Sequence, residues 1–208
     1  MLILYYILPK KRIKSGTFLS TLEQLPIDKA RRIRQIRDRR TQLQSIIGLK
    51  LVKLGFKQLK LRSFHLKKIH FSDKKPALRT SNFSIGHFSI SHSQNCICCV
   101  ISESKTVGID VEKIRPLSLN LIEKYQLTQN NPNDKLSPIS VWTQKEAIFK
   151  VFGEDKLHEL KQIKIKNGVS VFKDHQYHVD SFILEGKYSM SIASLQPNTK
   201  IKIKRVYF

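Results

Sequence analysis

The stretch Val107–Glu112, with the sequence VGIDVE, alternates apolar and acidic residues after its glycine. This period of two predicts a β-strand with Asp110 and Glu112 on one face and the apolar side chains on the other. Residues two apart on a strand lie about 6.6 Å apart, so these carboxylates can share a hard cation such as Mg²⁺. A solvated strand edge is the alternative, but Gly108 favours a site because glycine permits close approach of backbone or ligand.

A third acid follows in the stretch Trp142–Lys150, with the sequence WTQKEAIFK, which has the residue types of a helix. A helix places Trp142, Glu146 and Lys150 on one stripe, each about 6 Å above the last. The alternative is a set of exposed ion pairs that also includes Lys145, worth a few tenths of a kcal/mol. An aromatic anchor favours burial, and Glu146 then points into a partly buried site where its charge needs a metal.

The composition is strongly basic, with 38 Lys and Arg against 16 Asp and Glu and a formal net charge of +22 in 208 residues. Such an excess indicates an acidic partner, although much of it can be solvated surface. A nucleic-acid-binding protein that uses the Lys50–Lys75 stretch is one alternative, but no interleaved aromatic platform accompanies these lysines. The apolar fraction of 40% predicts a folded chain, long enough for one large domain or two small halves.

Local patterns predict the remaining elements. Met1–Leu8 is expected to be a buried strand, too short to span a membrane, and the absence of any longer apolar stretch predicts a soluble, cytoplasmic protein. The cluster Cys96, Cys98 and Cys99 is interpreted as buried strand rather than disulfide or metal ligand. Ser137 is expected to cap the helix that ends at Gly153. Helices are expected at 21–56, 119–125 and 138–152, and further strands at 82–91, 96–102, 163–165, 169–172, 177–184, 188–193 and 201–207.

Three segments in this order and spacing resemble one family. They are FSISHS at Phe88–Ser93, VGIDVEKIRP at Val107–Pro116 and WxxKEAxxK at Trp142–Lys150. Together they are similar to the surfactin-type 4′-phosphopantetheinyl transferases over roughly residues 25 to 195. The resemblance implies an α+β fold of two similar halves, residues 1–104 and 105–208, with the active site in the cleft between them. The length favours the monomeric, two-half type.

The resemblance also implies a reaction, in which phosphopantetheine passes from coenzyme A to a serine of an acidic carrier protein and 3′,5′-ADP is released. Mg²⁺, or Mn²⁺ as an alternative, would be bound by Asp110, Glu112, Glu146 and the pyrophosphate of coenzyme A. Glu146 would accept the serine proton, Lys150 would stabilise the leaving phosphate, and His92 would contact the phosphates. No nucleic acid or membrane is implied as a partner.

Further contacts with the cofactor are implied by the same resemblance, and they are expected from Lys29, Arg32, Lys75, Pro76 and Ser91. The carrier would dock beside Leu119–Asp134. The chain departs from the family where an arginine is usual and Gln44 stands, with Arg40 one turn earlier as the candidate replacement. A non-catalytic relative that binds coenzyme A or carrier is therefore the second alternative.

Overall fold

The computed structural model of the chain describes residues 2–9, 15–59, 66, 69–71, 76–79, 84–128, 136–153, 157–197 and 200–207. The elements of the first part are β1 (Leu2–Ile7), α1 (Ser15–Leu22), α2 (Ile27–Gln35), α3 (Arg39–Gln58), β2 (Ile69–Phe71), β3 (Pro76–Arg79), β4 (Ser84–Ser93) and β5 (Cys96–Ser102). Those of the second part are β6 (Val107–Lys113), α4 (Leu119–Tyr125), α5 (Pro138–Phe152), a 3₁₀ helix (Leu157–Gln162), β7 (Ile165–Lys166), β8 (Val169–Phe172), β9 (His175–Leu184), β10 (Tyr188–Ser194) and β11 (Ile201–Arg205).

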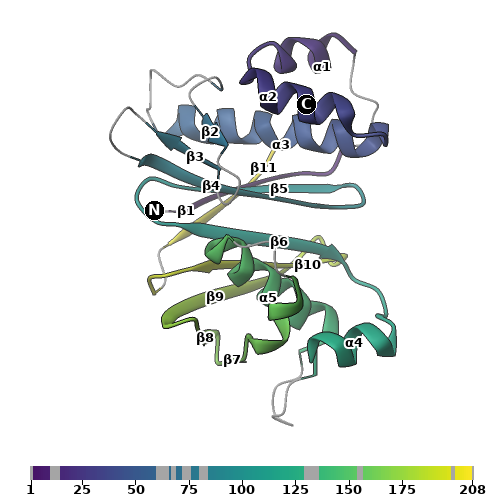
Figure 1. The fold of residues 1–208 in the computed structure, drawn as a ribbon, viewed down its shortest axis with the longest axis vertical. Coiled ribbons are helices and arrows are strands. Elements are labelled where there is room, and N and C mark those ends of the chain that lie inside the picture. Colours follow the sequence, from purple (N-terminus) through teal and green to yellow (C-terminus); the bar gives the residue numbers. More distant parts are fainter. Residues whose placement is uncertain are drawn as a thin grey trace.

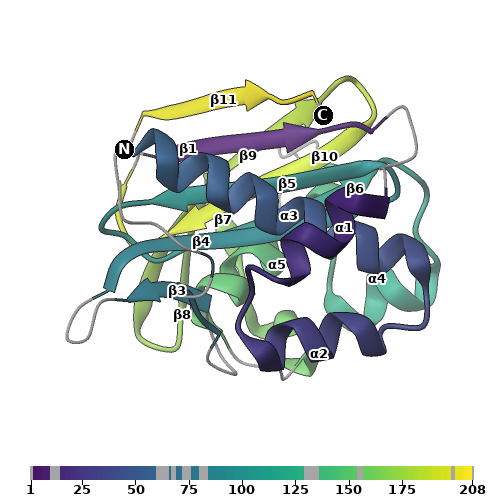
Figure 2. The same ribbon diagram turned by 90° about the horizontal axis from the view of Figure 1, so that it is seen from above.

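The described elements stack in four layers (Figure 1). A six-stranded sheet in the order β11-β1-β5-β4-β3-β2 carries α3 on one face, with α1 and α2 packed on α3. The other face of this sheet packs against a five-stranded sheet in the order β6-β10-β9-β8-β7, and α5 covers the far side of that second sheet. Figure 2 shows α3 lying over the strands of the first sheet. The α+β class is therefore confirmed.

The two sheets have strand orders that correspond position for position when β11 is set aside. In the first sheet β1 pairs antiparallel with β5, and in the second sheet β6 pairs antiparallel with β10. The other strands then follow in reverse chain order, β4-β3-β2 in the first sheet and β9-β8-β7 in the second. The strand β11 returns from the end of the chain to pair in parallel with β1. The first sheet is consequently not built from residues 1–104 alone.

Several local predictions are confirmed, and the differences have local causes. The segment expected as one helical region is divided at Ile36–Asp38, because the Asp38 side chain accepts a hydrogen bond from the Thr41 N–H and starts α3 afresh. The strand β4 extends through Ser93, two residues beyond the predicted end at 91, so it includes His92, and Gln94 and Asn95 form the turn. No helix among the described residues is long and apolar enough to cross a membrane.

The cysteine cluster forms part of the interior, as the sequence indicates. Cys96, Cys98 and Cys99 are fully buried free thiols of β5, the strand at the centre of the first sheet's contact with the second. Burial raises the pKa of the Cys98 and Cys99 thiols well above the ordinary value. These side chains therefore act as small apolar residues in the core.

Gly108 brings α5 against β6. A Cβ atom placed on Gly108 would lie 2.1 Å from the Ala147 carbonyl oxygen and 2.9 Å from the Val151 nitrogen. The helix backbone lies directly on the strand here, which carries Glu146 and Lys150 over the acidic residues of β6.

Gly108→Ala is expected to destabilise the protein by about 1–3 kcal/mol, because the added methyl group forces the backbones of α5 and β6 apart. Chemical unfolding measures the loss, and the emission of Trp142, the single tryptophan and a residue of α5, reports the displacement. Gly186→Ala is the control, since its Cβ would meet nothing within 4 Å and only its positive φ of 62° is strained. Emission that changes no more in Gly108→Ala than in the control contradicts this explanation.

Candidate functional site

Alternate serines of β4 join the two sheets at the site. The hydroxyls of Ser89, Ser91 and Ser93 accept hydrogen bonds from the backbone N–H groups of Ile109, Val111 and Lys113, at 3.2, 3.2 and 3.1 Å. These N–H groups belong to the edge of β6 that does not pair with β10. The serine hydroxyls thereby accept hydrogen bonds from backbone N–H groups that would otherwise be unpaired at the edge of β6. These bonds also fix the register between β4 and β6.

Asp110 lies at the centre of the cluster and is 5% exposed. Its Oδ1 accepts hydrogen bonds from the Ser91 hydroxyl at 2.8 Å and from the Lys150 ammonium at 2.7 Å. Its Oδ2 is buried and has no hydrogen-bond partner among the described residues. A buried carboxylate oxygen of this kind is costly unless a ligand or ion reaches it.

Glu112 lies two residues further along β6 and is half-buried. The Ser93 hydroxyl donates to its Oε2 at 2.7 Å. Burial raises the pKa of Glu112, and the charge of Asp110 raises it further, while the Ser93 bond, Arg115 and Lys150 lower it. The two acids of β6 are therefore on one face and interact electrostatically, as the alternation predicts.

Glu146 reaches the same cluster from α5. The pKa of Glu146 is raised to about 7, first by burial and then by the charge of Asp110, with Glu112 acting in the same direction and Lys150 opposing. The helix is anchored as expected, because Phe149 is buried and Trp142 packs edge-on against Tyr125 with ring centroids 5.2 Å apart. Two neighbouring acids of β6 thus interact electrostatically with a third acid from a distant segment of the chain.

The two ends of α5 differ in how they are capped. Gly153 ends the helix as predicted, with a φ of 80° and an N–H bonded to the Phe149 carbonyl oxygen. Ser137 is at the N-cap position, but its side chain makes no capping hydrogen bond and instead pairs with the Ser140 hydroxyl at 3.0 Å. The expected side-chain cap is therefore wrong, although the helix begins where it was predicted.

The chemistry of the cluster is that of oxygen ligands alone. As the side chains stand, no group of three or more His, Cys, Asp and Glu residues within the described ranges is arranged to hold a metal ion. The ammonium of Lys150 is instead the cation bonded to Asp110. The Asp110 Oδ2 has no partner among the described residues, and the charge of Asp110 adds to the effect of burial in raising the pKa of Glu112 and Glu146. Such a donor set suits a hard divalent cation.

Of the residues expected to contact phosphates, Ser91 and His92 adjoin the cluster. Ser91 is buried and bonded to Asp110, whereas the His92 side chain is exposed on the strand. The pKa of His92 is lowered, mainly by desolvation of the ring and then by the charge of Lys150, while Asp110 opposes this. A neutral imidazole beside Lys150 is the form that results near neutral pH.

The remaining expected contacts are on other elements or lie outside the described residues. Lys29 and Arg32 are on α2, which packs on α3 (Figure 1). Burial lowers the pKa of Lys29, and the charge of Arg32 lowers it further, so the two cations are close together as the helical spacing predicts. Pro76 begins β3, and Lys75 lies outside the described residues.

Lys145 has a role that the sequence reasoning missed. It is 4% exposed, and its ammonium donates to the carbonyl oxygens of Tyr125 and Gln126 at 2.8 and 3.1 Å. Burial lowers its pKa to about 8. The alternative interpretation of this lysine as part of an exposed ion pair is wrong. Its position four residues after Val141, on the buried face of α5, is the signal that would have found it.

Gln44, which replaces the usual arginine, is nearly buried and has a structural contact. Its side-chain amide donates to the Gln94 carbonyl oxygen at 2.7 Å, and Arg40 donates to the Asn95 side chain at 2.9 Å. Both residues of α3 therefore hold the turn that follows His92. Arg40 lies one helical turn before Gln44 and contacts the same turn, and its replacement of the usual arginine stays a prediction.

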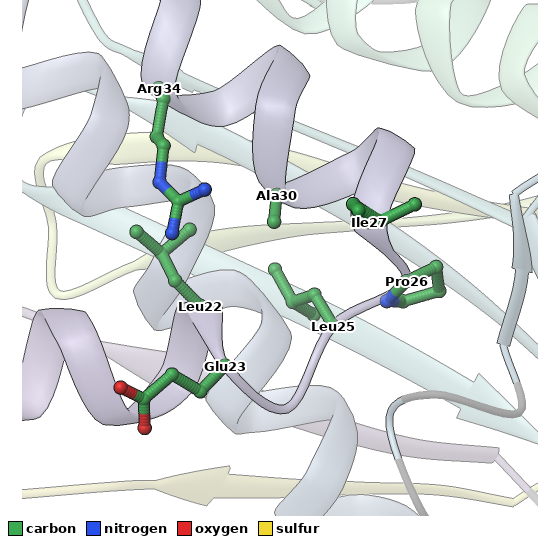
Figure 3. A pocket seen from close by; sticks show the side chains of 7 residues that line it. All are labelled: Leu22, Glu23, Leu25, Pro26, Ile27, Ala30 and Arg34. Carbon is green, nitrogen blue, oxygen red and sulfur yellow. The ribbon is translucent and has the colours of Figure 1, made fainter.

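A hollow of about 410 Å³ lies between α1 and α2 (Figure 3). Most of its lining side chains are apolar, and Glu23 and Arg34 are the charged ones. None of the predicted site residues lines it. The lining residues are Leu22, Glu23, Leu25, Pro26, Ile27, Ala30 and Arg34.

Comparison with known proteins finds similarity to curated 4′-phosphopantetheinyl transferases. The chain is 34% identical over 88 residues to HetI of a Nostoc species, covering 38% of this chain and 37% of HetI. It is 24% identical over 131 residues to Sfp of Bacillus subtilis, covering 54% and 56% of the two chains, and 25% identical over 126 residues to psf-1 of Bacillus pumilus, covering 53% and 54%. The chain spans at most about half the length of these curated relatives. No protein-family model matches it.

Proposed function

We propose that the chain is an enzyme that transfers 4′-phosphopantetheine from coenzyme A to a serine of a carrier protein and releases 3′,5′-ADP. The observation that carries this proposal is the electrostatic convergence of Asp110, Glu112 and Glu146, from a strand and a helix, around a lysine and a buried serine. The names of the similar curated proteins support the same activity.

Asp110, Glu112 and Glu146 are proposed to hold Mg²⁺ together with the pyrophosphate of coenzyme A. When bound, such an ion would supply the positive charge that offsets charge on the pyrophosphate, and these three carboxylates would hold it in place. The protein supplies oxygen ligands only, and the buried Asp110 Oδ2 is the oxygen that most needs a partner. The serine hydroxyls of β4 bond to the backbone of β6 and so help to hold its two acids in place.

Glu146 is proposed to accept the proton of the attacking serine, directly or through a water molecule. The serine oxygen forms a bond to the β-phosphorus of coenzyme A, the bond to the bridging oxygen breaks, and 3′,5′-ADP leaves with the electron pair. A carboxylate with a pKa near the working pH is suited to this transfer, and the pKa of Glu146 is about 7 in the protein without ligands. This role is typically worth about 10²–10⁴ in rate.

Lys150 and His92 are proposed to contact the phosphates, because both lie beside Asp110 and one is a cation. Lys29, Arg32, Lys75 and Pro76 are proposed to contact the nucleotide. Ser91 is proposed to act chiefly by fixing Asp110, since its hydroxyl already has partners within the protein.

The chain is further proposed to be a pair of similar α+β halves, residues 1–104 and 105–208, with coenzyme A in the cleft between them. The corresponding strand orders of the two sheets support this duplication. An acidic carrier would dock beside α4. Lys145 of α5, the residue before Glu146, donates hydrogen bonds to carbonyl oxygens at the C-terminal end of α4. Part of the +22 charge would then speed the encounter.

Intact-mass spectrometry tests the proposed activity. An apo acyl carrier protein and an apo peptidyl carrier domain are each incubated with the chain, coenzyme A and Mg²⁺, with EDTA in a parallel sample. We expect one of these carriers to gain the mass of one phosphopantetheine only when Mg²⁺ is present. A carrier panel that stays unmodified, with a known transferase modifying the same carriers, would overturn the proposal.

A further inference from the structure

Lys150 contacts the carboxylate of Asp110, which is proposed above as a metal ligand. Its ammonium is 2.7 Å from Asp110 Oδ1 and 3.1 Å from the Ser91 hydroxyl oxygen. The Asp110 side chain is 7% exposed, whereas the lysine side chain is 31% exposed. The carboxylate is therefore fixed in the interior, and the lysine approaches it from the solvent side.

Ser91 fixes this arrangement with a fully used hydroxyl. It donates to Asp110 Oδ1 and accepts hydrogen bonds from the Val111 N–H and from the Lys150 ammonium. One donor and two acceptor sites are all that a serine hydroxyl has. Removal of the ammonium would vacate one acceptor site without disturbing the hold on Asp110.

The negative charge at this place exceeds what the lysine compensates. Glu112 and Glu146 each interact electrostatically with both Asp110 and Lys150. The second carboxylate oxygen of Asp110 stays buried without a partner even with Lys150 in place. A single charge on a flexible stem is thus bonded to a site whose acids could accommodate a divalent ion.

We propose that Lys150 is a resident cation, which neutralises Asp110 while the site has no metal and must leave Asp110 when a divalent ion binds. This inference rests on the proposed metal site. The released ammonium is on the solvent side of the cluster, where a phosphate of the incoming cofactor would be its new partner. Metal and phosphate ligand then help each other to bind, because the phosphate stabilises the lysine position that frees the carboxylate.

Calorimetric titration with Mg²⁺ alone, without coenzyme A, tests the competition. Lys150→Met is expected to lower the Kd for Mg²⁺ by about three- to tenfold relative to the wild-type protein, the range that corresponds to a partly exposed ion pair. Lys150→Arg keeps the charge and should leave the affinity close to that of the wild type. Lys150→Gln provides a second neutral variant if the methionine variant does not fold.

Arg115→Gln is the matched control for general electrostatics. Arg115 is exposed and acts on Glu112 only through its charge, without a contact on Asp110. We expect this variant to change the Mg²⁺ affinity less than twofold. A gain equal to that of Lys150→Met would show that charge alone, and not occupation of Asp110, is responsible.

The remaining outcomes separate the two proposals. Equal or weaker Mg²⁺ binding in both neutral Lys150 variants overturns the resident-cation proposal and leaves the metal site standing. No measurable Mg²⁺ binding to the wild type and to every variant, at millimolar ion, would overturn the metal site itself and this inference with it.

Discussion

Glu146→Gln is expected to lower the rate of phosphopantetheine transfer by at least about 10²–10⁴-fold, the range for loss of a general base. The amide cannot accept the serine proton and is a poorer ligand for a hard cation. The fold should be retained, because Glu146 is not part of the buried apolar face of α5. Transfer rates from intact-mass time courses and the free energy of unfolding measure the two effects separately.

Glu103→Gln is the control for this change. Glu103 is exposed in the β5–β6 connection, outside the cluster. Its substitution by glutamine removes the same charge as Glu146→Gln does. Its transfer rate should equal that of the wild type. A Glu146→Gln protein that is folded and turns over within about threefold of the wild type would exclude Glu146 as the base.

Asp110→Asn is expected to abolish Mg²⁺ binding and to lower transfer by at least about 10²-fold. Mg²⁺ binding is lost because the substitution removes the most buried charge of the cluster. Transfer slows because several kcal/mol of transition-state stabilisation depend on a correctly held ion. The asparagine oxygen keeps an acceptor for Ser91, so the hydrogen bonds between the serines of β4 and the backbone of β6 should persist. Mg²⁺ titration followed by calorimetry measures the binding, and intact-mass time courses measure the transfer.

Asp180→Asn is the corresponding control, because Asp180 is a partly buried acid of β9 outside the cluster, with its pKa raised by burial. It should leave both Mg²⁺ affinity and transfer unchanged. Wild-type Mg²⁺ affinity in Asp110→Asn would show that the buried carboxylate is not a ligand.

The parts of the fold that were predictable from the sequence are those determined by nearby residues. The alternation in Val107–Glu112 gives the two faces of β6, and Gly153 ends α5 with a positive φ, as predicted. The helix α4 has the predicted bounds, Leu119–Tyr125. Each of these features depends on a period or a turn within about ten residues.

The features that were missed depend on contacts between distant segments. The parallel pairing of β11 with β1 joins the two ends of the chain, and no local pattern specifies it. The hydrogen bonds between the serines of β4 and β6 form only after the two sheets pack, so no local pattern indicates them. Lys145 was misread because the carbonyl groups that it caps belong to another helix.

The roles of the predicted site residues stay predictions, and the contacts around them were not predictable. The spacing of Asp110, Glu112 and Glu146 predicts that they lie near one another, and the charge of Asp110 raises the pKa of both glutamates. The spacing of residues in the sequence did not predict which cation contacts Asp110. The ion pair with Lys150 depends on the distance between α5 and β6, which Gly108 sets.

Calorimetric binding of coenzyme A with and without Mg²⁺ tests the central claim most directly. If the three carboxylates hold an ion that also binds the pyrophosphate, Mg²⁺ should lower the Kd for coenzyme A at least tenfold in the wild type. In Asp110→Asn it should lower this Kd by no more than twofold. Coenzyme A binding that is equally tight with Mg²⁺ and with EDTA in the wild type would contradict the account.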